Sequence, residues 1–206
     1  MNSFTIDANK YLNQNIQGFY HTDYKRYGNP GNPDYLNDLK NTYGKPDSND
    51  TEWYKKKELK KLKNATKQLY NVLKNNLITF DKNLTICIVP RSKAENTYKN
   101  NQLLFKKVVQ QLIDKLDFQD GSNYIIRHTD TKTTHLEHTE YGGDGDMPYV
   151  GITKNTCDIS SDVQGKDILL IDDIYTNGIN IDEDVIQALL DYGAKSVIFY
   201  AVGKTI

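Results

Sequence analysis

The residues with the clearest potential for chemistry lie in the last quarter of the chain. Asp172 and Asp173 follow the apolar run 167–171, and a short polar loop containing Gly178 then leads into a helical pattern. Ligands of open α/β sheets bind at the carboxyl ends of strands. A loop that enters a helix offers backbone N–H groups and a favourable partial charge to an anion, and a glycine lets a phosphate approach the backbone. The segment is therefore predicted to hold a sugar phosphate.

This segment resembles the signature that binds 5-phosphoribosyl-1-pyrophosphate (PRPP) in the type I phosphoribosyltransferases. The signature is a hydrophobic strand, two acidic residues, two variable residues, a threonine, and then a glycine and a second hydroxyl residue. Here Asp172, Asp173, Thr176 and Gly178 match it, residues 167–205 fit closely and residues 84–206 loosely. The alternative is a strand followed by two helix-capping aspartates, but adjacent buried carboxylates are costly without partners.

The resemblance implies a role for each residue of the loop. Asp172 and Asp173 would contact the ribose hydroxyls, directly or through Mg²⁺ and water. The 5′-phosphate would be held by the residues that follow: Thr176, Asn177, Gly178, Ile179 and Asn180. Asn177 and Asn180 depart from the family, which usually has a small or hydroxyl residue there. An asparagine amide can still donate a hydrogen bond to a phosphate.

A second basic loop fits the family's pyrophosphate loop. The apolar run 84–89 predicts a buried strand, and Pro90, Arg91, Ser92 and Lys93 follow it. An arginine, a hydroxyl and a lysine beside a strand end suit a diphosphate anion. Taken alone, the two basic residues would be ordinary surface charges.

The long polar segment 127–147 fits the family's mobile loop, which closes over PRPP. Arg127, with His128, Lys132 and His135, could meet the pyrophosphate, and residues 126–131 resemble the matching part of ComF-type members. Those members often carry an N-terminal zinc element rich in cysteine, and this chain has none. His135 and His138 have the spacing of zinc ligands, but no third and fourth ligand lie nearby, so a polar mobile loop is preferred.

The reaction that the resemblance implies is transfer of phosphoribosyl from PRPP to a base or amine acceptor, which makes the protein a pentosyltransferase. Asp172, Asp173 and Arg127 would be catalytic, and Mg²⁺ would be the cofactor. One alternative is a PRPP or nucleotide sensor with little catalysis, which Asn177 and Asn180 favour. Another is an interaction protein that keeps only the scaffold.

The acceptor would be chosen by an N-terminal hood over residues 1–50, with residues 51–206 forming the phosphoribosyltransferase-like domain. The hood is expected to be irregular, with loops and a short helix or strand pair. Its tyrosines, Tyr20, Tyr24, Tyr27 and Tyr35, could stack on a base or simply pack the hood on the domain. Thr176 stands where purine salvage enzymes carry a carboxylate, which argues against a purine of that type.

Periodicity supplies the elements that would position these residues. Apolar residues share one face of a predicted helix that Asp50 or Thr51 caps and that ends near residue 76; they are Leu59, Leu62, Ala65, Leu69, Val72 and Leu73. Further helices are predicted over 103–116 and 181–190, the latter ended by Gly193. Strands are predicted at 84–89, 124–126, 149–153, 167–171 and 196–202. The fold class is therefore α/β, an open and mostly parallel sheet flanked by helices.

Composition narrows the class of protein. The 206 residues carry 26 basic and 27 acidic side chains, a net charge of −1, so nucleic acid is not an expected partner. The lysines of 55–67 are interpreted as a solvated helix face, with a nucleic-acid or membrane patch as the alternative. Two cysteines, Cys87 and Cys157, and no apolar leader or membrane span indicate a cytoplasmic protein. The resemblance also suggests a homodimer.

Overall fold

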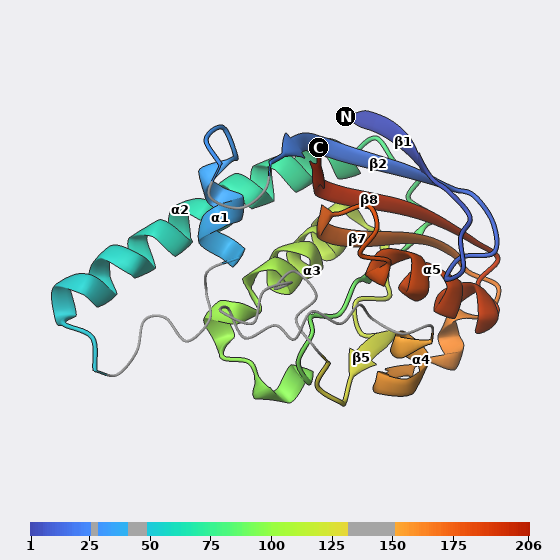
Figure 1. Cartoon of the computed structure of the whole chain (residues 1–206). Helices are drawn as coiled ribbons and strands as arrows, with labels where there is room; N and C mark the ends of the chain where they lie inside the picture. The colour runs from blue at the N-terminus through green and yellow to red at the C-terminus, as the bar shows by residue number, and fades with distance from the viewer. Residues whose placement is uncertain (26–28, 41–48, 132–150) are drawn as a thin grey trace.

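The centre of the fold is a six-stranded sheet with the strand order β1-β2-β8-β7-β3-β4. The structure is a computed structural model and describes residues 1–25, 29–40, 49–131 and 151–206 (Figure 1). The strands of this sheet are β1 (Asn2–Ile6), β2 (Ile16–Tyr24), β3 (Thr85–Ile88), β4 (Gln119–Asp120), β7 (Asp167–Tyr175) and β8 (Ser196–Thr205). All neighbours are parallel except β1 and β2, so the predicted α/β class with a mostly parallel sheet is confirmed.

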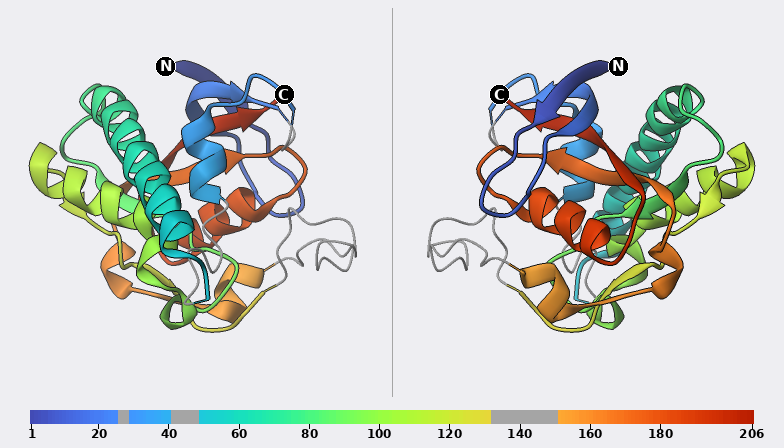
Figure 2. Two further views of the ribbon diagram at one scale, coloured as in Figure 1. Left: turned by 90° about the vertical axis from the view of Figure 1, so that its left-hand side faces the viewer. Right: turned by 90° about the vertical axis from the view of Figure 1, so that its right-hand side faces the viewer.

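Helices cover both faces of the sheet (Figure 2). The helices are α1 (Asp34–Lys40), α2 (Glu52–Leu77), α3 (Leu104–Leu116), α4 (Ile152–Thr156) and α5 (Ile181–Asp191), with 3₁₀ turns at Glu95–Thr97, Asn100–Gln102 and Ser161–Val163. α1, α2 and α3 lie on one face and α5 on the other. Alternate residues of strand β7 are buried against helices on opposite faces of the sheet. Leu169 and Ile171 belong to the core on the α2–α3 side, while Ile168 and Leu170 belong to the core on the α5 side.

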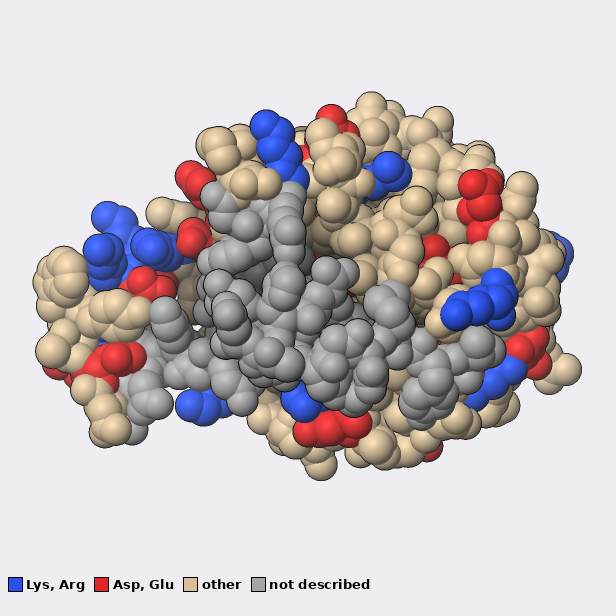
Figure 3. Space-filling view, in the orientation of Figure 1, with Lys and Arg blue, Asp and Glu red and all other residues tan. Residues whose placement is uncertain are grey.

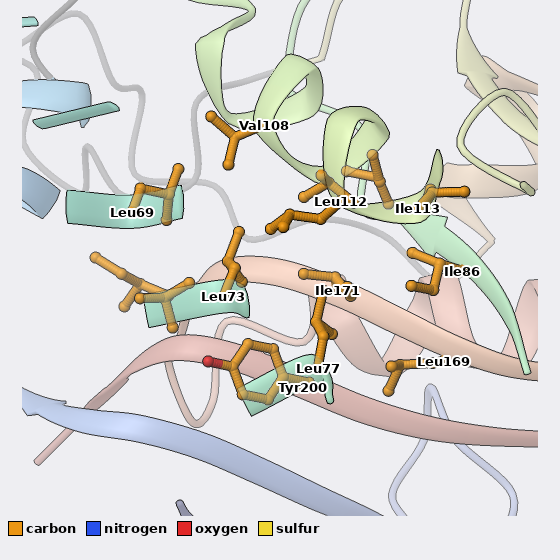
Figure 4. Close-up of a cluster of buried hydrophobic side chains, with 14 of the residues drawn as sticks. Leu69, Leu73, Leu77, Ile86, Val108, Leu112, Ile113, Leu169, Ile171 and Tyr200 are labelled. Carbon is orange, nitrogen blue, oxygen red and sulfur yellow. The ribbon is translucent and has the colours of Figure 1, made fainter. Parts of the chain in front are cut away.

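The long helix α2 confirms the predicted start and most of the predicted face. The side chain of Thr51 accepts the N–H of Tyr54 at 3.3 Å, which caps the helix. Leu69, Leu73 and Leu77 are fully buried and pack toward Ile171, Tyr200 and α3 (Figure 4). Leu59 was expected on this face but is 54% exposed. The first turns of α2 run beyond the sheet, so periodicity alone overestimated the length of the buried stripe.

The N-terminal segment contains the expected strand pair and a short helix, but the strands belong to the main sheet and do not form an irregular hood. β2 pairs in parallel with β8, from Gly18 with Phe199 to Tyr24 with Thr205, and β1 completes the edge. Tyr24 and Tyr35 are buried in the core, so they pack the fold and present no platform for a base. The segment is thus an edge of the main sheet, while the domain boundary at residue 50 stays a prediction.

Two predicted strands also proved different. β5 (Ile125–Arg127) leaves the main sheet and pairs antiparallel with β6 (Cys157–Ile159). The chain passes close over β3 just before this departure: a Cβ on Gly121 would lie 2.7 Å from Thr85 Cγ2 and 2.8 Å from Cys87 Sγ. Of the strand expected at 149–153, the described part begins the helix α4 at Ile152.

Candidate phosphate and ribose site

The two loops singled out in the sequence lie side by side at the carboxyl edge of the sheet. Ile88, the last residue of β3, pairs with Ile171 of β7, and the N–H of Val89 donates to the carbonyl of Ile171 at 3.0 Å. The basic loop at Arg91 therefore starts beside Asp172 and Asp173. The predicted end of the strand at residue 171 was wrong, because β7 stays paired with β8 as far as Tyr175. The aspartates therefore lie in the part of β7 that extends beyond its last pair with β3 and remains paired with β8.

Asp172 and Asp173 occupy a break in the alternation of β7. Ile171 and Ile174 both belong to the core on the α2–α3 side, whereas strict alternation would place them on opposite faces. Both aspartates between them are half-buried, and Asp172 Oδ1 accepts the N–H of Asp173 at 2.7 Å. The break keeps both carboxylates at the edge of the core, where a ligand could reach them.

Three further acidic residues, which the sequence reasoning missed, lie buried at the start of α5. Asp182, Glu183 and Asp184 are each no more than 5% exposed. Asp182 lies in hydrogen-bonding contact with Asp172; burial first, and then the charges of Asp172 and Glu183, raise its pKa well above the usual range. A like charge beside a buried carboxyl group favours its protonated form. The available signal was the run of three acids directly after a predicted phosphate loop.

The other two acids of this helix have protein partners. Glu183 Oε1 accepts the hydroxyl of Tyr175 at 2.9 Å. The carboxylate of Asp184 accepts the N–H groups of Gly151 and Thr153, both at 2.7 Å. Asp184 thereby ties the start of α4 to α5, which is a structural role.

The loop from Thr176 to Asn180 contains two residues with left-handed backbone conformation. Gly178 has φ +85°, and a Cβ there would meet nothing within 4 Å. Asn180 is also left-handed at φ 64°, a conformation that asparagine tolerates better than most residues. Its side chain donates to the carbonyl of Gly178 at 2.8 Å and accepts from Asn9 at 3.2 Å. Asn180 therefore closes the loop, while Asn177 and Gly178 are exposed.

Two other residues of this loop can be placed. Thr176 Oγ1 lies 2.8 Å from the hydroxyl of Thr205 at the end of β8, which ties the loop to the neighbouring strand. Ile179 donates its N–H to the carbonyl of Thr176 at 3.2 Å. The turn thus formed leads directly into the first turn of α5.

The basic loop after β3 is held by protein contacts. The guanidinium of Arg91 lies 4.7 Å from the ring centre of Tyr98, and its Nη1 donates to the carbonyl of Gln102 at 2.5 Å. Lys93 Nζ lies 3.5 Å from Asp130. The carbonyl of Ser92 accepts both the N–H and the hydroxyl of Thr131, at 2.7 and 2.9 Å. A ligand phosphate would have to compete with these partners.

Arg127 is buried, with 3% of its surface exposed. Its Nε donates to the carbonyl of Arg91 at 2.6 Å, and its Nη1 donates to the hydroxyl of Thr156 at 2.5 Å. In this arrangement Arg127 holds the basic loop through its backbone carbonyl at Arg91. It also lines a cavity of about 50 Å³ with Arg91, Lys93 and Tyr98, too small for PRPP.

Asp172 and Asp173 are the candidate ligands for the predicted Mg²⁺, and the predicted closing loop begins at Arg127. The site offers carboxylate oxygens of Asp172 and Asp173, the donors that Mg²⁺ prefers, and Mg²⁺ usually keeps several waters and substrate phosphates as its other ligands. Over the described ranges, no group of three or more His, Cys, Asp or Glu side chains is arranged to hold a metal. Most of the predicted closing loop, including Lys132, His135 and His138, lies outside the described residues.

The comparisons leave the family open. No protein-family model matches the sequence, and no curated protein matches it either. Among the described helices, none has the length and hydropathy needed to cross a membrane.

Proposed function

We propose that the chain is a Mg²⁺-dependent phosphoribosyltransferase that transfers phosphoribosyl from PRPP to a small base or amine and releases pyrophosphate. One observation carries the proposal: Ile88 of β3 pairs with Ile171 of β7, so the basic loop that follows β3 starts beside Asp172 and Asp173. Basic groups for a diphosphate and carboxylates for a ribose thus adjoin a loop that leads into a helix. PRPP carries these same groups in this order.

The chain's own residues would divide the task of binding. Backbone N–H groups around Gly178 and the start of α5 would hold the 5′-phosphate. Asp172 and Asp173 would accept the ribose hydroxyls, while Arg91 and Lys93 would meet the pyrophosphate after leaving Tyr98 and Asp130. Mg²⁺, when bound with PRPP, would neutralise charge on the leaving pyrophosphate.

A second candidate function is a PRPP-binding regulatory protein with little catalysis. The contacts of Arg91, Arg127 and Asn180 with protein atoms favour it, because these side chains are already engaged. Both functions need the same ribose and phosphate site. They differ in whether bound PRPP loses pyrophosphate when an acceptor is added.

The test is calorimetric titration of PRPP into the whole protein, with and without Mg²⁺. We expect micromolar binding that Mg²⁺ strengthens. Asp172→Asn combined with Asp173→Asn should abolish it, whereas Asp167→Asn, at the other end of the same strand, should bind as the wild type does. Equal binding by the double variant would show that the site is misplaced. Screening nucleobases and amines for pyrophosphate release then separates the enzyme from the sensor.

A further inference from the structure

The first half of α2 carries a set of lysines that the proposed function does not use. The helix projects beyond the sheet in Figure 1, and none of its residues before Leu62 is buried. Figure 3 shows basic side chains gathered over this end of the molecule. The core-facing side of α2 is filled by Leu62, Ala65, Leu69, Leu73 and Leu77.

Four of these lysines form a line, here called the lysine stripe: Lys56, Lys60, Lys63 and Lys67. Spacings of four, three and four residues keep them on one side of the helix, about 130° round from the buried side, in a line about 17 Å long. All four are exposed, and none forms an ion pair with a described residue. The neighbouring Lys55 and Lys61 do, with Glu52 and Glu58 at 3.7 and 3.6 Å.

Glu52 is spaced to reach Lys56 as well as Lys55, but its contact is with Lys55, and Glu58 contacts Lys61, so neither acid of this half-helix is in contact with the stripe. Like charges at these spacings repel one another and weaken a helix. An anionic partner with several charges along a line would relieve that repulsion. This pattern differs from an ordinary solvated face, in which the charges of both signs alternate.

An aromatic ring extends the same line. Trp53 lies three residues before Lys56, on the same side of the helix, and is 70% exposed. The Nζ of Lys57 lies 4.9 Å from its ring centre, which helps to hold the ring at the surface. An exposed ring beside a row of cations is the combination that binds single strands, since unstacked bases stack on the ring and phosphates follow the cations.

We propose that Trp53 and the lysine stripe form a binding surface for single-stranded nucleic acid. The net charge of −1 argued against such a partner, but salt screens charges beyond about 8 Å at physiological ionic strength, so the stripe acts locally. A membrane surface fits less well, because helices that lie in that interface insert an apolar face and this one has its apolar face in the core. Duplexes keep their bases stacked and unavailable to Trp53.

The experiment measures fluorescence anisotropy of labelled 15-nucleotide dT and rU strands with the full chain across a series of salt concentrations. Four phosphate contacts predict a slope of log K against log salt of about −3. Trp53 is the single tryptophan of the chain, so stacking should also quench the intrinsic fluorescence. Comparing dT with rU shows whether the 2′-hydroxyl contributes.

The key variant replaces the four stripe lysines by glutamine, and its control replaces Lys10, Lys82, Lys107 and Lys195. Each changes the net charge from −1 to −5. We expect the stripe variant to lose at least about tenfold in affinity and most of the salt slope, the control to stay within about threefold, and Trp53→Ala to lose about tenfold. Circular dichroism checks that α2 stays folded.

Three results would overturn the proposal. The first is equal loss of binding in the stripe variant and the control, which would mean that only the overall charge matters. The second is binding without quenching of Trp53. The third is tighter binding to phosphatidylserine vesicles or to poly-glutamate than to either oligonucleotide, which would assign the stripe to a membrane or to an acidic protein.

Discussion

At the scale of single residues, the site is dominated by carboxyl groups with different partners. Asp184 accepts two backbone N–H groups and Glu183 accepts a tyrosine hydroxyl, so each has a clear structural contact. Asp182 instead faces another acid, Asp172, and its Oδ1 has no hydrogen-bond partner among the described residues. Burial and the neighbouring charges therefore favour the protonated form of Asp182.

This pairing gives stability a definite dependence on pH. The folded pKa of Asp182 lies well above the ordinary 3.8, so between these two values the folded chain keeps a proton that the unfolded chain has lost. The free energy of unfolding must then fall as pH rises through that window, by about 1.4 kcal/mol for each pKa unit. Asp182→Asn removes this loss and can still donate to Asp172. We expect its advantage over the wild type in urea unfolding to grow as pH rises above the ordinary pKa of 3.8.

Asp184→Asn provides the contrast, because this residue lies on the same helix and is equally buried. Its carboxylate accepts from Gly151 and Thr153, so the substitution should cost about 1–2 kcal/mol at neutral pH. Parallel pH profiles for Asp182→Asn and the wild type would contradict the raised pKa of Asp182.

The place of a candidate residue in the fold was predictable from the sequence only where the residue types stand in a recognisable order. The order of Asp172, Asp173, Thr176 and Gly178 marks one loop, and the structure places it beside the basic loop as the topology of parallel strands requires. The burial of Asp182 could not be foreseen, because it depends on how α5 packs against β7. For the same reason, the sequence did not reveal that Arg127 turns toward the carbonyl of Arg91.

At the scale of elements, the loop before α5 combines backbone strain with open space. We expect Gly178→Ala to destabilise the fold by about 1–2 kcal/mol, because alanine is disfavoured at φ +85°. The new methyl group would also obstruct the proposed phosphate, so PRPP affinity should fall. Gly165→Ala is the control: its φ is +72°, its Cβ also meets nothing within 4 Å, and it lies before β7. Calorimetry should show weaker PRPP binding for Gly178→Ala alone, and equal affinities would argue against a phosphate at this loop.

Helix α2 divides into a packed half and a projecting half. Leu73 is fully buried between the sheet and α3, so Leu73→Ala should lower the free energy of unfolding by about 2–5 kcal/mol. Leu59→Ala removes the same atoms from a residue that is 54% exposed. It should change the free energy of unfolding by no more than about 0.5 kcal/mol. Urea denaturation of both variants measures the difference. Similar losses would mean that the first half of α2 packs against something in solution.

Elements with a strong local period were predictable, and their pairings were not. In α2, α3 and α5 the apolar residues recur with the helical period because one side of each helix is buried, and in β7 they form a continuous run because both faces of the strand are buried. Such patterns can be read directly from the sequence of each element. The pairing of β2 with β8 joins residues far apart in the chain, and no local pattern encodes it. The two-residue strand β4 is likewise too short to leave a period.

At the scale of the whole molecule, a small unit of β5, β6 and α4 is attached to the main sheet at the candidate site. Arg127 joins it to the basic loop, and Asp184 joins it to α5. The basic loop and the first turn of α5, which follows the other loop, are thus both bonded to the same small unit. Changes in that unit should therefore affect both ligand binding and stability.

Arg127→Lys tests this bracing against the direct catalytic role that the resemblance implies. Lysine keeps the charge but cannot donate in the fixed fork geometry that reaches both Arg91 and Thr156, so we expect a loss of about 2–3 kcal/mol in unfolding free energy and weaker PRPP binding. Arg91→Lys is the matched control. Because Arg91 is exposed, this substitution should lower the free energy of unfolding by less than about 1 kcal/mol. Unchanged stability of Arg127→Lys with a reduced rate of pyrophosphate release would instead show that Arg127 acts on the substrate. Because a brace and a catalytic group differ in whether the unliganded protein is affected, urea unfolding without PRPP distinguishes them.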